Sequence, residues 1–280
     1  MPDQAAGLRS LFARRRPSLL IVAGSDACKA AVAVHFAHEA AAGSRATVLI
    51  DGTAGQVATA CELACRYELA HVLAGDMAID AVLRALTPHL LLMPAARALS
   101  RFGSFSAAED GRLADAFSTG ITQALASAGS QETQVDLIVV NAEEAQAARA
   151  VEAFGRDARV VIVASDNAQS LRGAYVEMKA LAQQQNLENF EIVVPRFDET
   201  GTSGIAFTNL ANAARRFLDI ELRDGGSVLL AVPQGIKSAM PIRGSGFVPA
   251  APSTGANDDE SDSSSPSLSI AEVSHAAAVA

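Results

Sequence analysis

The fold is decided by the stretch LLIVAGSDACKAAVAVHFA, residues 19–37, in which an apolar run passes through small residues into an alanine-rich segment. Residues 19–23 are continuously apolar, which is typical of a strand covered on both faces. Residues 30–42 have the composition of a buried helix. The stretch therefore predicts the first strand, turn and helix of an α/β domain.

The same alternation continues along most of the chain. Further strands are expected at residues 47–50, 90–93, 135–140, 159–164, 190–194 and 227–231. Helices are expected at residues 79–86, 107–128, 143–154, 168–184 and 204–218. Strands that alternate with helices predict an α/β fold, a mostly parallel sheet with helices on both faces. Such sheets bind their ligands at the carboxyl ends of the strands.

Composition excludes several functional classes. The chain has 280 residues, enough for one large α/β domain, and 50% of them are hydrophobic. Aromatic residues make up 5% with no Trp, and the net charge is −9, so we expect no direct contact with nucleic acid. No apolar run reaches the roughly 18 residues of a membrane span. Three cysteines are too few for a disulfide scaffold and favour the cytoplasm.

The two ends of the chain differ from its middle. Residues 1–17 contain five charged side chains and few apolar ones, and we expect them to form an interaction arm. Residues 18–243 form the α/β domain. Residues 244–280 are rich in Ser, Pro, Gly and Ala, with five acidic residues and no Lys or Arg. A segment of this kind buries too little apolar surface to fold, so we expect a disordered acidic tail.

The first strand-to-helix turn lies where a phosphate-binding loop lies in other α/β proteins. Such a loop uses several glycines, a Lys for the phosphates, and then a Ser or Thr for magnesium. Here the turn has one glycine, Gly24, and its Lys29 is followed by Ala30. The local pattern alone favours an ordinary turn between a strand and a helix over a phosphate-binding loop.

Several separated segments resemble one family. They are DQAAGLR (3–9), HVLAGDM (71–77), VVIVASDNAQSLRGAY (160–175), FEIVVPR (190–196) and AARRFL (213–218). Their order and spacing resemble the FlhG/FleN group of bacterial flagellar regulators, a branch of the MinD/ParA-type deviant P-loop ATPases. The resemblance covers about residues 1–243 and implies a MinD/ParA-like P-loop fold.

The resemblance also shows which phosphate contacts are missing. Gly24 stands where the family has its signature Lys, and Ser25 and Asp26 replace a glycine pair. Cys28 replaces the glycine before the loop lysine, and Lys29 alone matches. An acidic side chain at residue 26 would face phosphate oxygens of like charge. We therefore regard Gly24 and Lys29 as vestigial nucleotide-binding residues.

The residues expected on the magnesium side are also replaced. Ala30 offers no oxygen, and the family's DxD is reduced to Asp51 followed by Thr53. Asn141 replaces the Walker B aspartate, and Pro195 replaces an adenine-reading Asn. Each such contact contributes about 3–4 kcal/mol to phosphoryl transfer. The losses together predict a pseudo-ATPase that needs neither ATP nor magnesium, with Asp51 as a third vestigial residue. Weak nucleotide binding through Lys29 stays open.

The N-terminal arm is then the expected working part. The arm contains the DQAAGLR segment at residues 3–9. In the flagellar family the corresponding motif folds as a helix onto the SRP-type GTPase FlhF and stimulates GTP hydrolysis. The resemblance implies that Gln4 acts at the GTP site, that Asp3 and Arg9 make polar contacts, and that Leu8 anchors the helix. The alternative is a charged, frayed terminus, but agreement at five fixed positions favours the motif.

The resemblance thus predicts a regulator of flagellar number and placement that binds an FlhF-like GTPase. Other expected partners are flagellar basal-body components or flagellar transcription regulators, and a partner would recruit the protein to the cell pole or flagellar base. Two alternatives stay open: an active ATP-dependent MinD/ParA-like switch, and a MinD-like partner protein of another secretion or partition system.

Two other patterns are given little weight. One pattern is Cys61 and Cys65 near His71, and the other is His35 with His38. Neither has the spacing of a metal site. Buried thiols are also common in proteins without a metal. We therefore expect no metal. MinD-type proteins end in a basic amphipathic helix that binds lipid, whereas this tail is acidic, so membrane binding is not expected.

Overall fold

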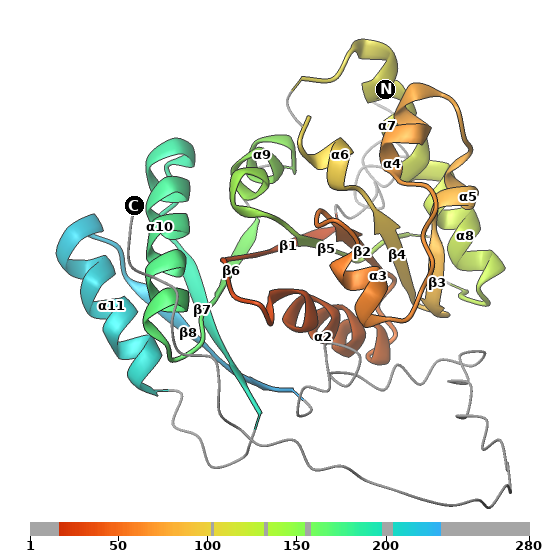
Figure 1. Ribbon diagram of the computed structural model, residues 1–280. Helices are drawn as coiled ribbons and strands as arrows, with labels where there is room; N and C mark the ends of the chain where they lie inside the picture. Colours follow the sequence, from red (N-terminus) through yellow and green to blue (C-terminus); the bar gives the residue numbers. More distant parts are fainter. Residues whose placement is uncertain (1–16, 102–103, 132–133, 155–157, 198–203, 231–280) are drawn as a thin grey trace, which may run out of the picture. The chain divides into compact units, whose positions relative to one another are not determined.

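The residues that the structure describes form one eight-stranded sheet in the order β3-β4-β2-β5-β1-β6-β7-β8 (Figure 1). This computed structural model describes residues 17–101, 104–131, 134–154, 158–197 and 204–230, which all belong to one compact unit. The strands are β1 (Ser18–Ala23), β2 (Thr47–Asp51), β3 (Arg84–Thr87), β4 (Leu90–Pro94), β5 (Leu137–Asn141), β6 (Arg159–Val163), β7 (Phe190–Arg196) and β8 (Leu222–Leu229). Within them, β3 is antiparallel to β4 and the other neighbouring pairs are parallel.

The central strands are apolar on both faces because helices cover both faces. Along β1, Leu20 and Val22 pack with α2 (Lys29–Ala42) and α3 (Gln56–Ala60), whereas Ile21 and Ala23 belong to the core on the opposite side. This explains why residues 19–23 show no alternation of polar and apolar side chains. The prediction of an α/β fold with a mostly parallel sheet is confirmed.

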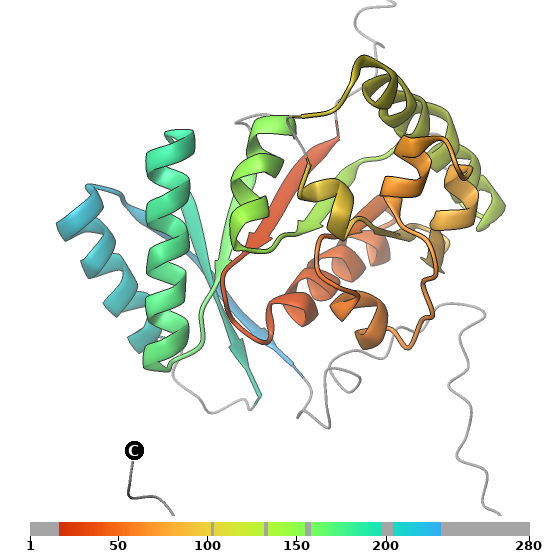
Figure 2. The same cartoon turned by 45° about the horizontal axis from the view of Figure 1, so that its top comes forward.

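The other helices lie on the second face (Figures 1 and 2). They are α4 (Leu69–Ala74), α5 (Ile79–Val82), α6 (Ala96–Leu99), α7 (Ala107–Asp115), the π-helical turn η1 (Ala116–Gly120), α8 (Ile121–Ser127), α9 (Glu144–Phe154), α10 (Ala168–Gln185) and α11 (Gly204–Leu218). Of all these helices, none within the described ranges combines the length and apolar character needed to cross a membrane.

The prediction of one helix over residues 79–86 is wrong. Only Ile79–Val82 is helical, and Arg84–Thr87 forms β3. These residues pair with β4, which supplies a partner for their backbone groups and overrides the helical pattern.

The last strand begins earlier than the expected residue 227, at Leu222. It contains Gly225 and Gly226, the latter with a φ of 82°, and the pairing with β7 shifts register between Ile192 and Val194. Glycines and an irregular register are typical of a bulge, which hides the start of the strand in the sequence.

The register of β1 and β2 with β5 places the candidate nucleotide-binding residues at one edge of the sheet. Val22 of β1 and Asp51 of β2 both lie opposite Asn141, the last residue of β5. The turn after β1 therefore meets the ends of β2 and β5 at the carboxyl edge of the sheet.

Candidate functional site

The turn between β1 and α2 is shaped by a close approach to β6. Gly24 has a φ of 112°, and a Cβ there would lie 2.7 Å from the carbonyl oxygen of Val163. A positive φ of this kind favours glycine. Gly24 is thus required by the neighbouring backbone, whether or not a ligand is present.

Asp26 lies in the middle of this turn and is buried, with 8% of its surface exposed. Its Oδ1 accepts a hydrogen bond from the N–H of Cys28 at 2.8 Å. Its Oδ2 accepts from the N–H of Ser165 at 2.9 Å and from Ser170 Oγ at 2.6 Å. Burial raises the pKa of Asp26, but the hydrogen bonds from Ser165, Ser170 and Cys28 outweigh it, so the pKa is lowered.

Lys29 is the first residue of α2 and is also buried, at 7% exposure. Its ammonium donates to the carbonyl oxygen of Ala142, just after β5, at 2.5 Å. Burial lowers the pKa of Lys29, and the negative charges of Glu177, Glu143 and Asp51 oppose that shift. The lysine is therefore bonded within the protein and surrounded by the protein's own acidic groups.

Asp51 ends β2 and is 1% exposed. Its Oδ1 accepts from the N–H and Oγ1 of Thr53, at 3.0 and 2.5 Å, and from Asn141 Nδ2 at 3.2 Å. Its Oδ2 accepts from the N–H of Val57, in the first turn of α3, at 3.1 Å. Burial raises the pKa of Asp51, and these hydrogen bonds offset the rise only in part. Asp51 thus fixes the loop that leads into α3.

Asn141 shares the carboxyl edge with Asp51 and is fully buried. Its amide donates to Asp51, and within the described part of the chain no partner is found for its Oδ1. An Asp at residue 141 would place two carboxylates at this distance, an arrangement that a bound cation normally compensates. The neutral amide avoids a second buried negative charge beside Asp51.

A pocket of about 480 Å³ opens beside the turn. It is lined by Gly24, Ser25, Asp26, Ala27, Lys29, Gln56 and Glu143. The structure thus brings Gly24 and Lys29 together at one pocket, whereas Asp51 is not among the lining residues and is bonded to Thr53 and Asn141. The candidate arm residues Asp3, Gln4, Leu8 and Arg9 lie outside the described residues, as do most of the arm and the whole acidic tail.

Residues missed by the sequence analysis complete the turn. Ser165 and Ser170 bind Asp26, and a Cβ on Gly173 of α10 would lie 1.7 Å from Ser25 Oγ. Figure 2 shows the first turn of α10 beside the turn that follows β1. Ser165 to Gly173 lie in a segment that carries the family resemblance, but nothing in its sequence marks them as partners of Asp26.

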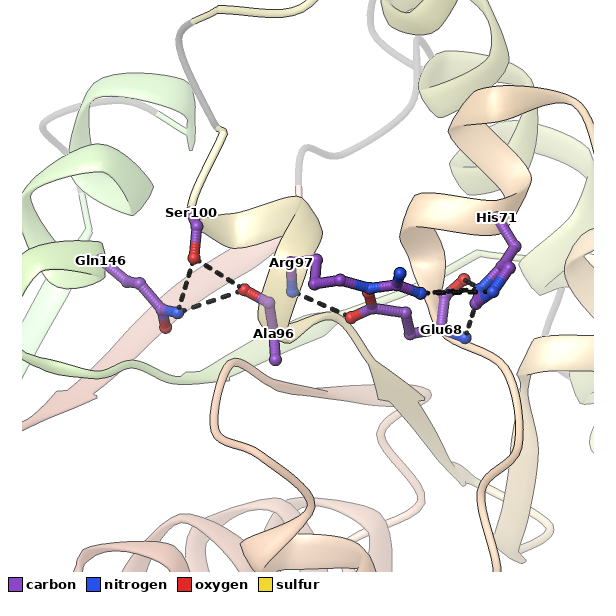
Figure 3. Close-up of polar contacts among 6 residues, drawn as sticks. All are labelled: Glu68, His71, Ala96, Arg97, Ser100 and Gln146. Atoms are coloured by element: carbon purple, nitrogen blue, oxygen red, sulfur yellow. Dashed lines mark hydrogen bonds and ion pairs between the residues drawn. The ribbon is translucent and has the colours of Figure 1, made fainter.

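A second polar network connects α4, α6 and α9 at the same edge (Figure 3). Gln146 of α9 donates to the carbonyl of Ala96 and to Ser100 Oγ, each at 3.3 Å. Glu68 accepts from the backbone N–H of Arg97 at 2.9 Å and forms an ion pair with its guanidinium, which also contacts His71. These contacts hold α9 and α4 against α6, which lies between them in Figure 3.

The residues present do not fit a magnesium nucleotide. Ala30 has no side-chain oxygen, one N–H of the Lys29 ammonium donates to the carbonyl of Ala142, and Asp26 accepts from the backbone N–H of Cys28. Within the described ranges there is no group of three or more His, Cys, Asp or Glu residues placed to hold a metal ion.

Comparison with known proteins identifies the fold. No family model and no curated protein matches the chain. Among solved structures, MinD of Aquifex aeolicus has 16% identity and a TM-score of 0.52, covering 80% of this chain and 89% of that one. McdA of Cyanthece, in its apo form, has 12% identity and a TM-score of 0.51, covering 81% and 91%. A plasmid partition protein of Borrelia burgdorferi bound to AMPPNP has 13% identity and a TM-score of 0.50, covering 81% and 91%.

The fold is that of the MinD/ParA-type P-loop ATPases. In a MinD/ParA-type fold the turn between β1 and α2 is the place of the phosphate-binding loop. In this chain the turn contains Gly24 and Lys29; Asp26 accepts a hydrogen bond from the Cys28 N–H, and Lys29 donates one to the carbonyl oxygen of Ala142.

Proposed function

We propose that this chain is a non-catalytic regulator with a MinD/ParA-type fold, which acts by binding a partner protein. The observation that carries the proposal is the hydrogen bond from Lys29 Nζ to the carbonyl oxygen of Ala142. A lysine that binds phosphate uses its ammonium for that contact, whereas this ammonium is buried and one of its three N–H groups donates to a carbonyl oxygen within the chain. Ala30 and Asn141 support the same conclusion, because neither is an anionic or hydroxyl ligand for magnesium.

We further propose that the partner is an SRP-type GTPase similar to FlhF, and that the process is flagellar biosynthesis. Support comes from the motif at residues 3–9, in which Gln4 would complete the GTP site, Asp3 and Arg9 would make polar contacts, and Leu8 would anchor the segment. A short segment that folds on binding can supply such a contact without a catalytic domain of its own. Recruitment to the cell pole or flagellar base would follow from the partner.

The first test is a titration of the full chain with a fluorescent ATP analogue and magnesium, with phosphate release measured in parallel. We expect neither saturable binding in the micromolar range nor turnover, and we expect Lys29→Ala to behave as the unmodified chain does. Saturable binding with turnover that Lys29→Ala abolishes would show an active ATPase switch instead.

The second test measures GTP hydrolysis by an FlhF-type GTPase in the presence of this chain. We expect stimulation, and we expect Gln4→Ala to abolish it without changing the thermal unfolding midpoint. Gln131→Ala is the matched control, since it removes an exposed glutamine from the described part of the chain. Equal stimulation by Gln4→Ala and the unmodified chain would contradict the role of the arm.

A further inference from the structure

The Asp26 carboxylate lies between the N-terminal ends of two long helices. It accepts from the N–H of Cys28, which directly precedes α2, and from the Oγ hydroxyl of Ser170 in the first turn of α10, whose own N–H donates to Asn167 Oδ1. The third donor is the N–H of Ser165, in the loop between β6 and α10. Helix N-termini carry a partial positive charge and unpaired N–H groups, and they bind anions for that reason.

The contacts of Asp26 are those of a bound anion. Both carboxylate oxygens are used, the distances run from 2.6 to 2.9 Å, and the residue is 8% exposed. The turn and α10 approach closely at Gly173, where a Cβ would lie 1.7 Å from Ser25 Oγ and would require that hydroxyl to move. A phosphate group entering the turn would compete with Asp26 for the Cys28 N–H and would meet a carboxylate of like charge.

We propose that Asp26 is a tethered anion, which holds the N-terminal turns of α2 and α10 together and occupies the Cys28 N–H that a phosphate group would otherwise use. The turn then keeps its shape without a nucleotide. This inference rests on the proposed function, in that a chain that has given up nucleotide binding needs another anion at this place.

The experiment removes the Asp26 carboxylate by mutation and supplies inorganic phosphate in solution. We expect Asp26→Gly to lower the thermal unfolding midpoint, and inorganic phosphate to restore part of the loss in a saturable way. Phosphate at about tenfold its dissociation constant should raise the midpoint of Asp26→Gly by roughly 3–6 °C over sodium chloride of equal ionic strength. The unmodified chain and Asp166→Gly, which removes an exposed acid from the same β6–α10 loop, should show no such rise.

Two outcomes would overturn the inference: a phosphate effect of equal size in the unmodified chain, or none in a folded Asp26→Gly variant. If Asp26→Gly does not fold, the unmodified chain decides the question through the carboxyl ¹³C shift of Asp26. We expect this carboxyl to stay ionised below pH 3.8, its ordinary pKa, in the folded protein. Protonation at or above that pH would contradict the three hydrogen bonds.

The test separates this inference from the proposed function. ATP turnover by the unmodified chain would contradict the proposed function. The phosphate response of Asp26→Gly and the titration of Asp26 test the role of the carboxylate alone. A normal GTPase response with no gain of phosphate binding in Asp26→Gly would remove only the inference.

Discussion

At Gly24 the backbone is held by two constraints at once, a φ of 112° and an approach that would leave a Cβ 2.7 Å from Val163 O. Gly24→Ala should lower the free energy of unfolding by about 2–4 kcal/mol, because the added Cβ would meet the backbone of β6 and alanine rarely adopts this φ. Gly129→Ala is the matched control: its φ is 92°, and a Cβ there would meet nothing within 4 Å. We expect Gly129→Ala to lower the free energy of unfolding by about 1 kcal/mol.

Urea denaturation of the two variants measures the difference. Similar losses at Gly24 and Gly129 would mean that the contact with Val163 is absent in solution.

The thiol of Cys28 reports on the Asp26 charge beside it. Burial, followed by the negative charge of Asp26, raises the pKa of Cys28 to about 11. Only the thiolate reacts with iodoacetamide, so near pH 8 we expect alkylation roughly a hundredfold slower than for a thiol with an ordinary pKa. The rate should rise about tenfold for each pH unit until the pKa is reached.

Mass spectrometry of the native chain, with the unfolded chain as reference, measures this rate. Asp26→Asn should speed alkylation at Cys28, because it removes the charge and keeps the size of the side chain. An unchanged alkylation rate in a folded Asp26→Asn variant would show that the Asp26 charge does not affect the Cys28 thiol.

At the scale of elements, β2 and β5 end on a buried polar pair, Asp51 and Asn141. Asn141→Asp would place a second carboxylate against Asp51. We expect it to lower the free energy of unfolding by about 3–5 kcal/mol at neutral pH, since the nearby Lys29 ammonium already interacts with the charges of Glu177, Glu143 and Asp51 and a further buried carboxylate would repel Asp51. Asn189→Asp, which adds an exposed carboxylate, should have little effect.

The pH dependence of this loss has a defined sign. In the folded variant one carboxyl of the pair has a raised pKa, so above about pH 4 the folded state binds more protons than the unfolded state. The stability of Asn141→Asp should therefore fall as the pH rises from about 4 towards the raised pKa, relative to the unmodified chain. Equal losses at acid and neutral pH, measured by urea denaturation, would mean that the two carboxylates do not interact.

At the scale of the whole molecule, the described residues contain a core on each face of the sheet. Deletion of residues 1–17 should therefore leave the thermal unfolding midpoint within about 2 °C of that of the full chain, while stimulation of the partner GTPase is lost. Calorimetry measures the unfolding midpoint, and a pull-down with the GTPase tests whether the partner is still bound. A large fall in the midpoint would show that the arm is part of the core.

Particular residues show how far the sequence predicts the site. The positions of Gly24 and Lys29 at the turn follow from an apolar strand, a small-residue loop and an alanine-rich helix, which are local features. The sequence also indicates that Asp26 is unfavourable beside a phosphate group. It does not reveal that Asp26 binds Ser165 and Ser170, which are 139 and 144 residues away in the chain, since a single sequence contains no information on such pairs.

Residue type and local spacing were enough to predict the alternation of strands and helices and the mostly parallel sheet, because both depend on local features of the sequence. Tertiary structure alone decided what the remaining charged groups do. The sheet brings the ends of β1, β2, β5 and β6 to one edge, where Lys29 meets Ala142 and Asp26 meets the start of α10. Buried charged groups must find partners where the fold places them, and here the partners come from distant parts of the chain.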